Sequence, residues 1–329
     1  MNDDKSILKV RNLSTCFKTD RGVVTAVDDI SFELNGGETL GIVGESGCGK
    51  TVTGKSIMRL LPEHLSFFKP DSRIEFDGMN LITANRKTMR DVRGNRIAMI
   101  FQEPMTALNP VFTVGWQLDE ALKYHTTLNS RQRRERLIEM LNLVDMPNPE
   151  HRLREYPHQL SGGMRQRVLI AIALCCDPDI LIADEPTTAL DVTIQAQILR
   201  LMDDLKKKTG TAIILITHDL GVVAQTCDRV IVMYAGRVVE EALVRDIFHR
   251  PQHPYTKALL ESVPKTGDRQ HGERLPAIEG IVPSLHELPV GCRFHDRCSF
   301  REDRCIDEEP PLEAAEAERH VRCHFPLEN

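Results

Sequence analysis

Short apolar runs bounded by polar residues predict strands along the first hundred residues. The runs lie at residues 7–13, 30–34, 38–43, 74–76 and 97–101. The run at 38–43 is typical of a buried strand, and it is followed by a glycine-rich turn at 44–51 and by helical spacing at 52–61. This part of the chain therefore predicts a strand, a loop and a helix in direct succession.

Helical spacing dominates from residue 106 to about residue 176. Residues 180–183 and 212–217 are continuous apolar runs, which are typical of strands covered on both faces, and a helix at 193–208 separates them. The stretch 230–240 favours a hairpin, because two apolar runs flank a short turn with a glycine.

Beyond residue 250 the apolar periodicity fades and prolines become frequent. We therefore expect two domains, at residues 1–250 and 251–329. The predicted fold class is α/β: a mixed-sheet core around the loop at 44–51, an antiparallel edge sheet, a helical subdomain at about 103–176 and a small cysteine-rich C-terminal domain.

Composition and charge narrow the function classes. The chain has 329 residues, of which 41% are apolar and 27% charged, so it can bury a sizeable core. The net charge of −6 argues against nucleic acid as the main partner, since nucleic-acid binders usually carry a basic excess. The first six residues do not resemble a secretory signal, and the longest apolar run, 168–176, is shorter than the ~18–20 residues that span a bilayer. We therefore expect a cytoplasmic protein that reaches a membrane only through partners.

A phosphate-binding pattern, G-x-x-x-x-G-K-[ST], lies between the predicted strand and helix. Its glycines let successive backbone N–H groups point into one concavity, and the following helix adds its positive end. We expect the Lys50 ammonium to reach the β- and γ-phosphates of ATP and the Thr51 hydroxyl to bind Mg²⁺. A chance glycine turn is the simpler alternative, but the flanking strand and helix argue against it. The matching residues are Gly44, Glu45, Ser46, Gly47, Cys48, Gly49, Lys50 and Thr51.

The predicted strand at 180–183 ends in two acidic residues, Asp184 and Glu185. A carboxylate at a strand end can hold the Mg²⁺ shell, and the next one can polarise the attacking water as a general base. An acid pair at a helix start is the alternative interpretation, because Pro186 follows. The phosphate loop in the same chain favours the catalytic interpretation.

Residues 160–167, LSGGMRQR, resemble the signature motif of ABC ATPases, usually written LSGGQ, with Met164 in place of the glutamine. Together with the phosphate loop and the acid pair, this motif identifies the chain as a member of that family. The resemblance implies that Ser161, Gly162 and Gly163 face the ATP of a second subunit. Two ABC ATPase subunits would then close around the nucleotide.

The same resemblance assigns roles to four further residues. Three of them, Gln102, Asp191 and His218, would each alone more simply be a polar loop residue or a satisfied histidine. Gln102 is similar to the Q-loop glutamine, which binds Mg²⁺ with Thr51 and Asp184. Asp191 is similar to the D-loop aspartate at the ATP site, and His218 to the catalytic switch histidine. Phe17 lies where the family places an aromatic ring on adenine.

Two stretches beyond residue 250 resemble the C-terminal region of oligopeptide/dipeptide importer ATPases, a family that includes nickel importers. They are 253–256, HPYT, and 289–298, PVGCRFHDRC. The resemblance implies an importer at the cytoplasmic face of the inner membrane. Its other parts would be a second, non-identical ABC ATPase subunit, two transmembrane permease subunits and an extracytoplasmic solute-binding protein.

The predicted function is therefore ATP hydrolysis that powers the uptake of peptides, with dipeptides as the expected solute. Uptake of nickel or another small solute by the same family is the first alternative. An ABC ATPase without transport is a weaker one, because the chain has one phosphate loop and no long heptad run.

Four of the nine cysteines lie in the last 38 residues, at the spacing C-x5-C-x6-C-x17-C. They are Cys292, Cys298, Cys305 and Cys323. An odd number of cysteines in a chain without a secretory signal argues against disulfides. Four thiolates suit a soft metal, and structural zinc commonly uses C-x2-C pairs, which are absent from this spacing. The family resemblance favours a [4Fe–4S] cluster, with Zn²⁺ and free thiols as the alternatives.

Overall fold

The computed structural model describes residues 6–101, 107–187, 192–263, 278–316 and 318–328. Two predicted site residues, Gln102 and Asp191, lie outside the described residues. The chain packs as two compact units. One comprises residues 1–7, 34–38 and 83–215, and the other comprises residues 8–33, 39–82 and 216–329.

The unit that contains the phosphate loop has an antiparallel sheet with the strand order β2-β1-β5-β6, and β4 pairs with β1. The strands are β1 (Ser6–Thr19), β2 (Gly22–Asn35), β4 (Ser66–Phe68), β5 (Arg73–Phe76) and β6 (Met79–Asn80). Both β1 and β2 are longer than their apolar runs at 7–13 and 30–34 predict. A strand that buries one face continues wherever alternate residues face the core, and polar residues can take the other positions.

The second sheet of this unit has the order β12-β13-β11-β10-β3, where β10 runs parallel to β3 and antiparallel to β11. The strands are β3 (Thr39–Val43), β10 (Arg229–Tyr234), β11 (Arg237–Leu243), β12 (Glu313–Glu316) and β13 (Arg319–Val321). The predicted hairpin at 230–240 is confirmed. The chain beyond residue 250 returns to this sheet through β13, which pairs with β11. The C-terminal residues therefore pack in the same unit as the phosphate loop.

Short helices connect these strands. They are α1 (Lys50–Ile57), α9 (Leu220–Thr226), α10 (Val244–His249), α11 (Pro254–Glu261), the 3-10 turn η2 (His295–Arg297) and α12 (Asp303–Asp307). The helix predicted at 52–61 thus begins two residues earlier and ends at residue 57. The apolar pattern does not reveal the regular structure beyond residue 250, because its elements are short and β12 is exposed at all four residues.

The other unit contains β7 (Ile97–Ile100), β8 (Ile180–Asp184) and β9 (Ala212–Ile216), in the order β9-β8-β7. All three strands are buried throughout, as their continuous apolar runs predict, and β7 runs parallel to β8.

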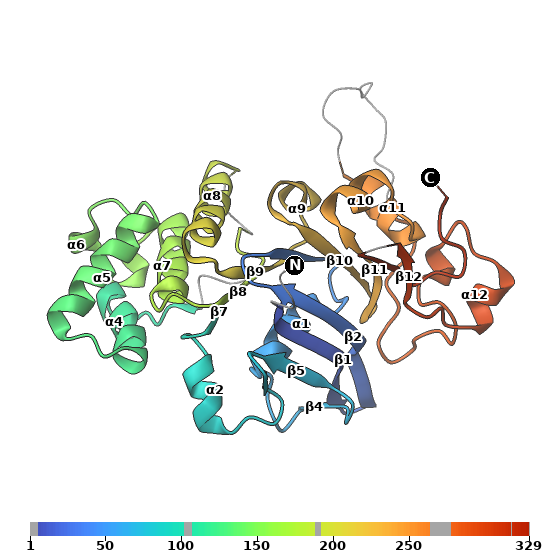
Figure 1. Cartoon of the computed structure of the whole chain (residues 1–329), viewed down its shortest axis with the longest axis horizontal. Coiled ribbons are helices and arrows are strands. Elements are labelled where there is room, and N and C mark those ends of the chain that lie inside the picture. The colour runs from blue at the N-terminus through green and yellow to red at the C-terminus, as the bar shows by residue number, and fades with distance from the viewer. Residues whose placement is uncertain (1–5, 102–106, 188–191, 264–277, 317, 329) are drawn as a thin grey trace, which may run out of the picture. The chain divides into compact units, whose positions relative to one another are not determined.

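Most of this unit's helices fall in the predicted helical stretch at 106–176. They are α4 (Val114–His125), α5 (Ser130–Leu143), α6 (Pro149–Arg152), the 3-10 turn η1 (Pro157–Gln159) and α7 (Gly162–Leu174), with α2 (Arg86–Val92) and α8 (Val192–Thr209) outside it. Figure 1 shows α4, α5, α6 and α7 side by side. Thr113 caps the start of α4, and Asn129 forms a capping box with Gln132 at the start of α5.

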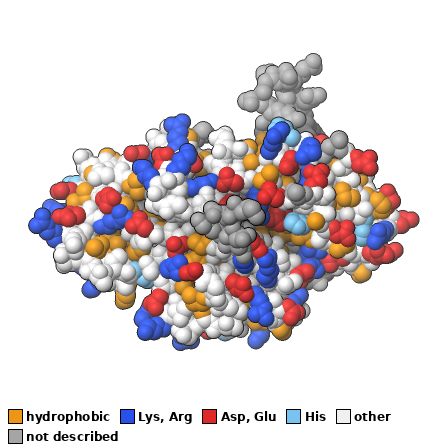
Figure 2. All heavy atoms as spheres, viewed as in Figure 1, with side chains coloured by type: hydrophobic (Ala, Val, Ile, Leu, Met, Phe, Trp, Pro, Cys, Tyr) orange, Lys and Arg blue, Asp and Glu red, His pale blue; other side chains and the backbone are white. Residues whose placement is uncertain are grey.

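Lys and Arg side chains are interspersed with Asp and Glu side chains over the face shown in Figure 2. Within the described parts of the chain, no helix is long and apolar enough to cross a membrane.

Candidate functional site

The phosphate loop lies directly against neighbouring backbone. It follows β3, which is buried at all five residues. Gly44 has φ +148°, and a Cβ there would lie 2.2 Å from the Met233 carbonyl oxygen. Gly49 has φ +103°, and a Cβ there would lie 2.6 Å from the Ala26 carbonyl oxygen. Both positions therefore require glycine, for the backbone angle and for the space.

Lys50 folds back across this loop. Its ammonium donates to the carbonyl oxygens of Gly44, at 2.7 Å, and Glu45, at 3.0 Å, and the residue is 6% exposed. Gly49 caps α1 and no side chain hydrogen-bonds the cap. The first backbone amides of α1 are therefore not claimed by a capping side chain, which suits an anion site at the helix start.

One part of the phosphate loop is buried and hydrogen-bonded, and its middle residues are exposed. The Cys48 side chain is fully buried, burial raises the pKa of its thiol, and the Gly236 N–H donates to the Cys48 carbonyl at 3.0 Å. Ser46 and Gly47, in contrast, are exposed. The loop thus presents its middle residues outward on a fixed base.

Two further predicted site residues belong to the same unit. Phe17 is half-buried near the end of β1, opposite Ser66 of β4. His218 is exposed two residues after β9. The next residue, Asp219, caps α9 by accepting the N–H groups of Gly221 and Val222 at 2.9 and 3.1 Å.

The predicted acid pair lies in the other unit, at the end of the buried strand β8. Asp184 is 1% exposed, and Glu185 is half-buried with φ +48°. This left-handed conformation turns the chain sharply out of the strand. The buried Gln166 amide of α7 donates to the Pro186 carbonyl at 2.6 Å, so α7 is tied to the residue that follows the acid pair.

The signature motif begins α7 in this same unit. Ser161 caps the helix, and its hydroxyl accepts the N–H of Met164 at 3.3 Å. Met164 takes part through its backbone, so replacement of the usual glutamine leaves this cap intact. Ser161 and Gly162 are exposed, and a Cβ at Gly162 would meet no atom within 4 Å. This helix start is open to another molecule.

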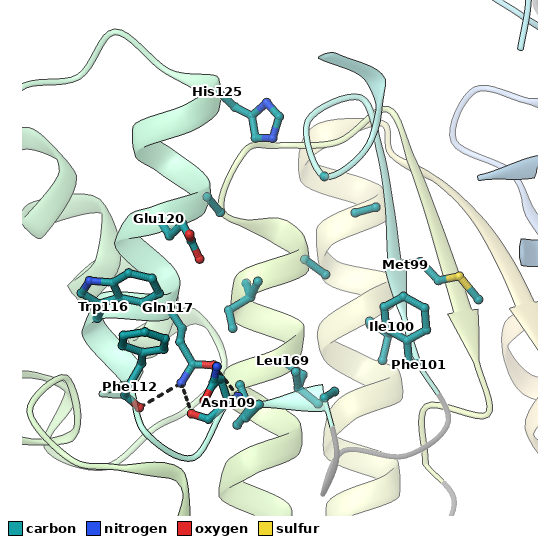
Figure 3. Close-up of a pocket in the computed structure, with 17 residues that line it drawn as sticks. Met99, Ile100, Phe101, Asn109, Phe112, Trp116, Gln117, Glu120, His125 and Leu169 are labelled. Carbon is teal, nitrogen blue, oxygen red and sulfur yellow. Dashed lines mark hydrogen bonds between the residues drawn. The ribbon is translucent and has the colours of Figure 1, made fainter. Parts of the chain in front are cut away.

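This unit also contains an apolar groove, which is shown in Figure 3 and which the sequence did not predict. Its volume is about 540 Å³, and it runs between β7 and the helices α4 and α7. Phe112 stacks on Trp116 with ring centroids 3.9 Å apart, and Trp116 is 46% exposed. The Gln117 amide donates to the carbonyls of Asn109, at 3.1 Å, and Phe112, at 3.0 Å. These hydrogen bonds fix the backbone at the edge of the groove.

The four C-terminal cysteines line one small cavity of about 10 Å³. Burial raises the pKa of Cys298, that of Cys292 to about 11 and that of Cys323 to about 12. Among the described residues, however, no group of three or more His, Cys, Asp or Glu side chains is placed to hold a metal ion. The predicted metal centre is therefore not confirmed.

Two family models match the chain. Residues 27–188 match the ABC transporter model, and residues 239–305 match the model of the oligopeptide/dipeptide transporter C-terminal region. The chain is 53% identical to the dipeptide transport ATP-binding protein DppD of Bacillus subtilis, over 97% of this chain and 94% of that protein. It is 48% identical to DppD of Escherichia coli, over 98% of both. This chain belongs to the ABC transporter ATP-binding proteins.

Solved ABC cassettes share the fold. The dimeric structure of MJ0796, described as a bacterial ABC transporter cassette, superposes with a TM-score of 0.65 at 28% identity and covers 72% of this chain and 99% of the cassette. A post-hydrolysis dimer of MJ0796 bound to ADP and Pi gives the same TM-score at 27% identity. The predicted α/β class and family resemblance are confirmed, and the ABC ATPase fold implies ATP and Mg²⁺ as ligands.

We predict that Lys50→Ala weakens ATP binding about tenfold or more, because a charge-assisted contact to the phosphates is lost. Calorimetric titration of the purified chain with Mg²⁺-ATP measures the change. Lys123→Ala is the matched control, because Lys123 is exposed on α4. Unchanged affinity in Lys50→Ala would exclude residues 44–51 as the phosphate site.

Proposed function

We propose that this chain is the ATP-hydrolysing subunit of a peptide importer, with dipeptides as the expected solute, at the cytoplasmic face of the inner membrane. The proposal rests on one observation above the others. The chain is similar to dipeptide transport ATP-binding proteins over nearly its whole length, including the oligopeptide/dipeptide C-terminal region.

In this proposal each part of the site has a role in binding ATP. The amides of residues 44–49 and the Lys50 ammonium hold the phosphates, and Phe17 stacks on adenine. Ser161, Gly162 and Gly163 bind the γ-phosphate of the ATP held by a partner subunit, with Asp191 beside it. The exposed start of α7 supports this arrangement, because a capped and uncovered helix N-terminus attracts an anion.

Hydrolysis needs a base and a charge-stabilising environment. Glu185 takes a proton from the attacking water, and His218 contacts the γ-phosphate region. Thr51, Gln102 and Asp184 would hold Mg²⁺, which would neutralise the charge that develops on the phosphates. The buried position of Asp184 supports its role, because a carboxylate at the end of a buried strand is held in one orientation.

We predict that Glu185→Gln retains ATP binding and lowers ATP turnover about 10²-fold or more, since the water loses its base. Turnover is measured in the assembled transporter, and uptake of labelled dipeptide is measured in cells that lack the native chain. Glu139→Gln, an exposed change on α5, serves as control. Dipeptide uptake that continues without the chain, or nickel uptake that depends on it, would contradict the peptide assignment.

We further propose that the apolar groove of Figure 3 receives a cytoplasmic segment of a permease subunit. Exposed stacked aromatic rings with a fixed polar edge are typical of a site that anchors a helix. Phe101 and Ala107, which flank the segment that carries Gln102, both line the groove. A segment bound there would contact the residues on either side of a proposed Mg²⁺ ligand.

The complete importer would also contain a second permease, a non-identical ATPase partner and a solute-binding protein.

We predict that Trp116→Asp prevents co-purification with the permease subunits, because it places a charge in the apolar groove. ATP affinity should stay within about twofold of wild type, since the change is on the surface and away from the phosphate loop in sequence. Tyr124→Asp is the control: Tyr124 is 71% exposed on the same helix and does not line the groove. Equal co-purification of both variants would exclude the groove as the docking site.

We also propose that the four C-terminal cysteines bind a [4Fe–4S] cluster. The chemistry of the donor groups supports this proposal, because four thiols line one cavity together with Phe294, Phe300 and Phe325. A soft, thiol-lined and largely apolar pocket suits iron–sulfur ligation. The cavity must widen to admit a cluster, since its volume of about 10 Å³ holds no more than one water molecule.

We predict about four iron and four acid-labile sulfide ions per chain after anaerobic purification, because four thiolates hold one cuboid cluster. Cys298→Ser should lose most of the iron, whereas Cys227→Ser, at a buried cysteine outside this group, should not. Metal and sulfide analysis measures both. Stoichiometric zinc without sulfide would favour the Zn²⁺ alternative, and absence of metal would leave free thiols.

A further inference from the structure

Glu45 of the phosphate loop forms an ion pair with a residue of the C-terminal region. The Arg297 guanidinium donates to both carboxylate oxygens of Glu45, at 2.6 and 2.9 Å. The Arg297 side chain is 4% exposed and that of Glu45 28%. This is a bidentate arginine–carboxylate pair with little solvent around it, which is stronger and more directional than a surface ion pair.

Every donor of Arg297 is engaged. Apart from Glu45, the guanidinium donates to the Tyr234 hydroxyl at 3.3 Å. It also donates to the carbonyls of Ile278 and Glu279, at 3.3 and 2.9 Å. An arginine has five N–H donors in a fixed planar fork, so these five contacts set its orientation completely. The hydrogen bonds to Glu45 raise the pKa of Arg297, so the guanidinium stays charged.

The backbone of Glu45 is held from the same side. Its N–H donates to the Tyr255 hydroxyl at 2.9 Å, and Tyr255 is fully buried on α11. The Tyr255 ring packs against Phe294, with centroids 5.3 Å apart. Both the amide and the carboxylate of Glu45 are therefore turned toward residues beyond position 250.

A carboxylate in a phosphate-binding loop disfavours the binding of a negatively charged ligand. ATP brings several negative charges to this loop, and an unpaired carboxylate nearby repels them. It also competes for the Lys50 ammonium, which already lies against the Glu45 carbonyl. An arginine that pairs with this carboxylate removes both effects, because it cancels the charge and fixes the direction of the side chain.

We propose that Arg297 is a positioning residue for ATP binding: it neutralises Glu45 and holds that carboxylate away from the bound phosphates. The proposal rests on the proposed ATP site at residues 44–51. It makes the C-terminal region part of the nucleotide site through a charge balance between one residue of the loop and one residue 252 positions later.

The test is a charge-balance series in the full-length chain, with Mg²⁺-ATP affinity measured by calorimetry. Arg297→Ala leaves one uncompensated negative charge and should weaken ATP binding about tenfold, with a smaller loss at high salt. Glu45→Gln removes that charge and should bind ATP at least as tightly as wild type. The double variant is neutral again and should return to within about threefold of wild type. Arg304→Ala is the control, because Arg304 pairs with Glu308 in the same C-terminal region.

The rescue separates positioning from folding. If Arg297 only stabilises the fold, the double variant binds ATP as weakly as Arg297→Ala, and the proposal is overturned. Equal affinity of Arg297→Ala and wild type overturns it as well, while the phosphate site still stands. If Arg297→Ala does not fold, Arg297→Gln, which keeps most of the side chain, takes its place in the same series. Unchanged affinity in Lys50→Ala would remove the phosphate site itself, and this proposal with it.

Discussion

The phosphate loop depends on one steric constraint, which is the direct contact of its backbone with the carbonyl groups behind it. Gly44 leaves no room for a side chain beside the Met233 carbonyl, and Gly49 leaves none beside the Ala26 carbonyl. A hydrogen bond from Gly236 to the Cys48 carbonyl closes the same contact. Any side chain at the two glycines would push the loop away from this base. The direction of Lys50 and of the first amides of α1 therefore follows from packing that involves no ligand.

The base of the loop is in turn held by charge. The Asp28 N–H donates to the Gly236 carbonyl at 2.9 Å. Burial alone would raise the pKa of Asp28, but three neighbouring cations lower it on balance. These cations are Lys69, Arg237 and Arg293. Asp28 therefore stays ionised at neutral pH, and Arg293, which lies one residue after Cys292, links this base to the C-terminal region as well.

The sequence predicts well those secondary-structure elements whose position depends on residues close together in the chain. The strand, loop and helix around Lys50 and the hairpin at 230–240 depend on local spacing, and both are found. The strands at 313–321 leave no apolar pattern in the sequence, since β12 is exposed and β13 has only three residues. The pair of Glu45 with Arg297 joins positions 252 residues apart, and no spacing rule in one sequence connects them. The roles of all the predicted site residues, and the domain boundary near residue 250, stay predictions.

The net charge of the chain and the charge around one loop have different consequences for ligand binding. A net charge of −6 disfavours a polyanion as a surface partner, because nucleic acid binds over an extended basic face. In the proposed site the phosphates of ATP lie against one loop, where backbone amides and the Lys50 ammonium lie within a few residues of each other. At that scale a single carboxylate matters more than the net charge, since Coulomb energy falls with distance and solvent screens the remote groups. On our proposal, an acidic protein holds ATP because Arg297 pairs with the acid inside the loop.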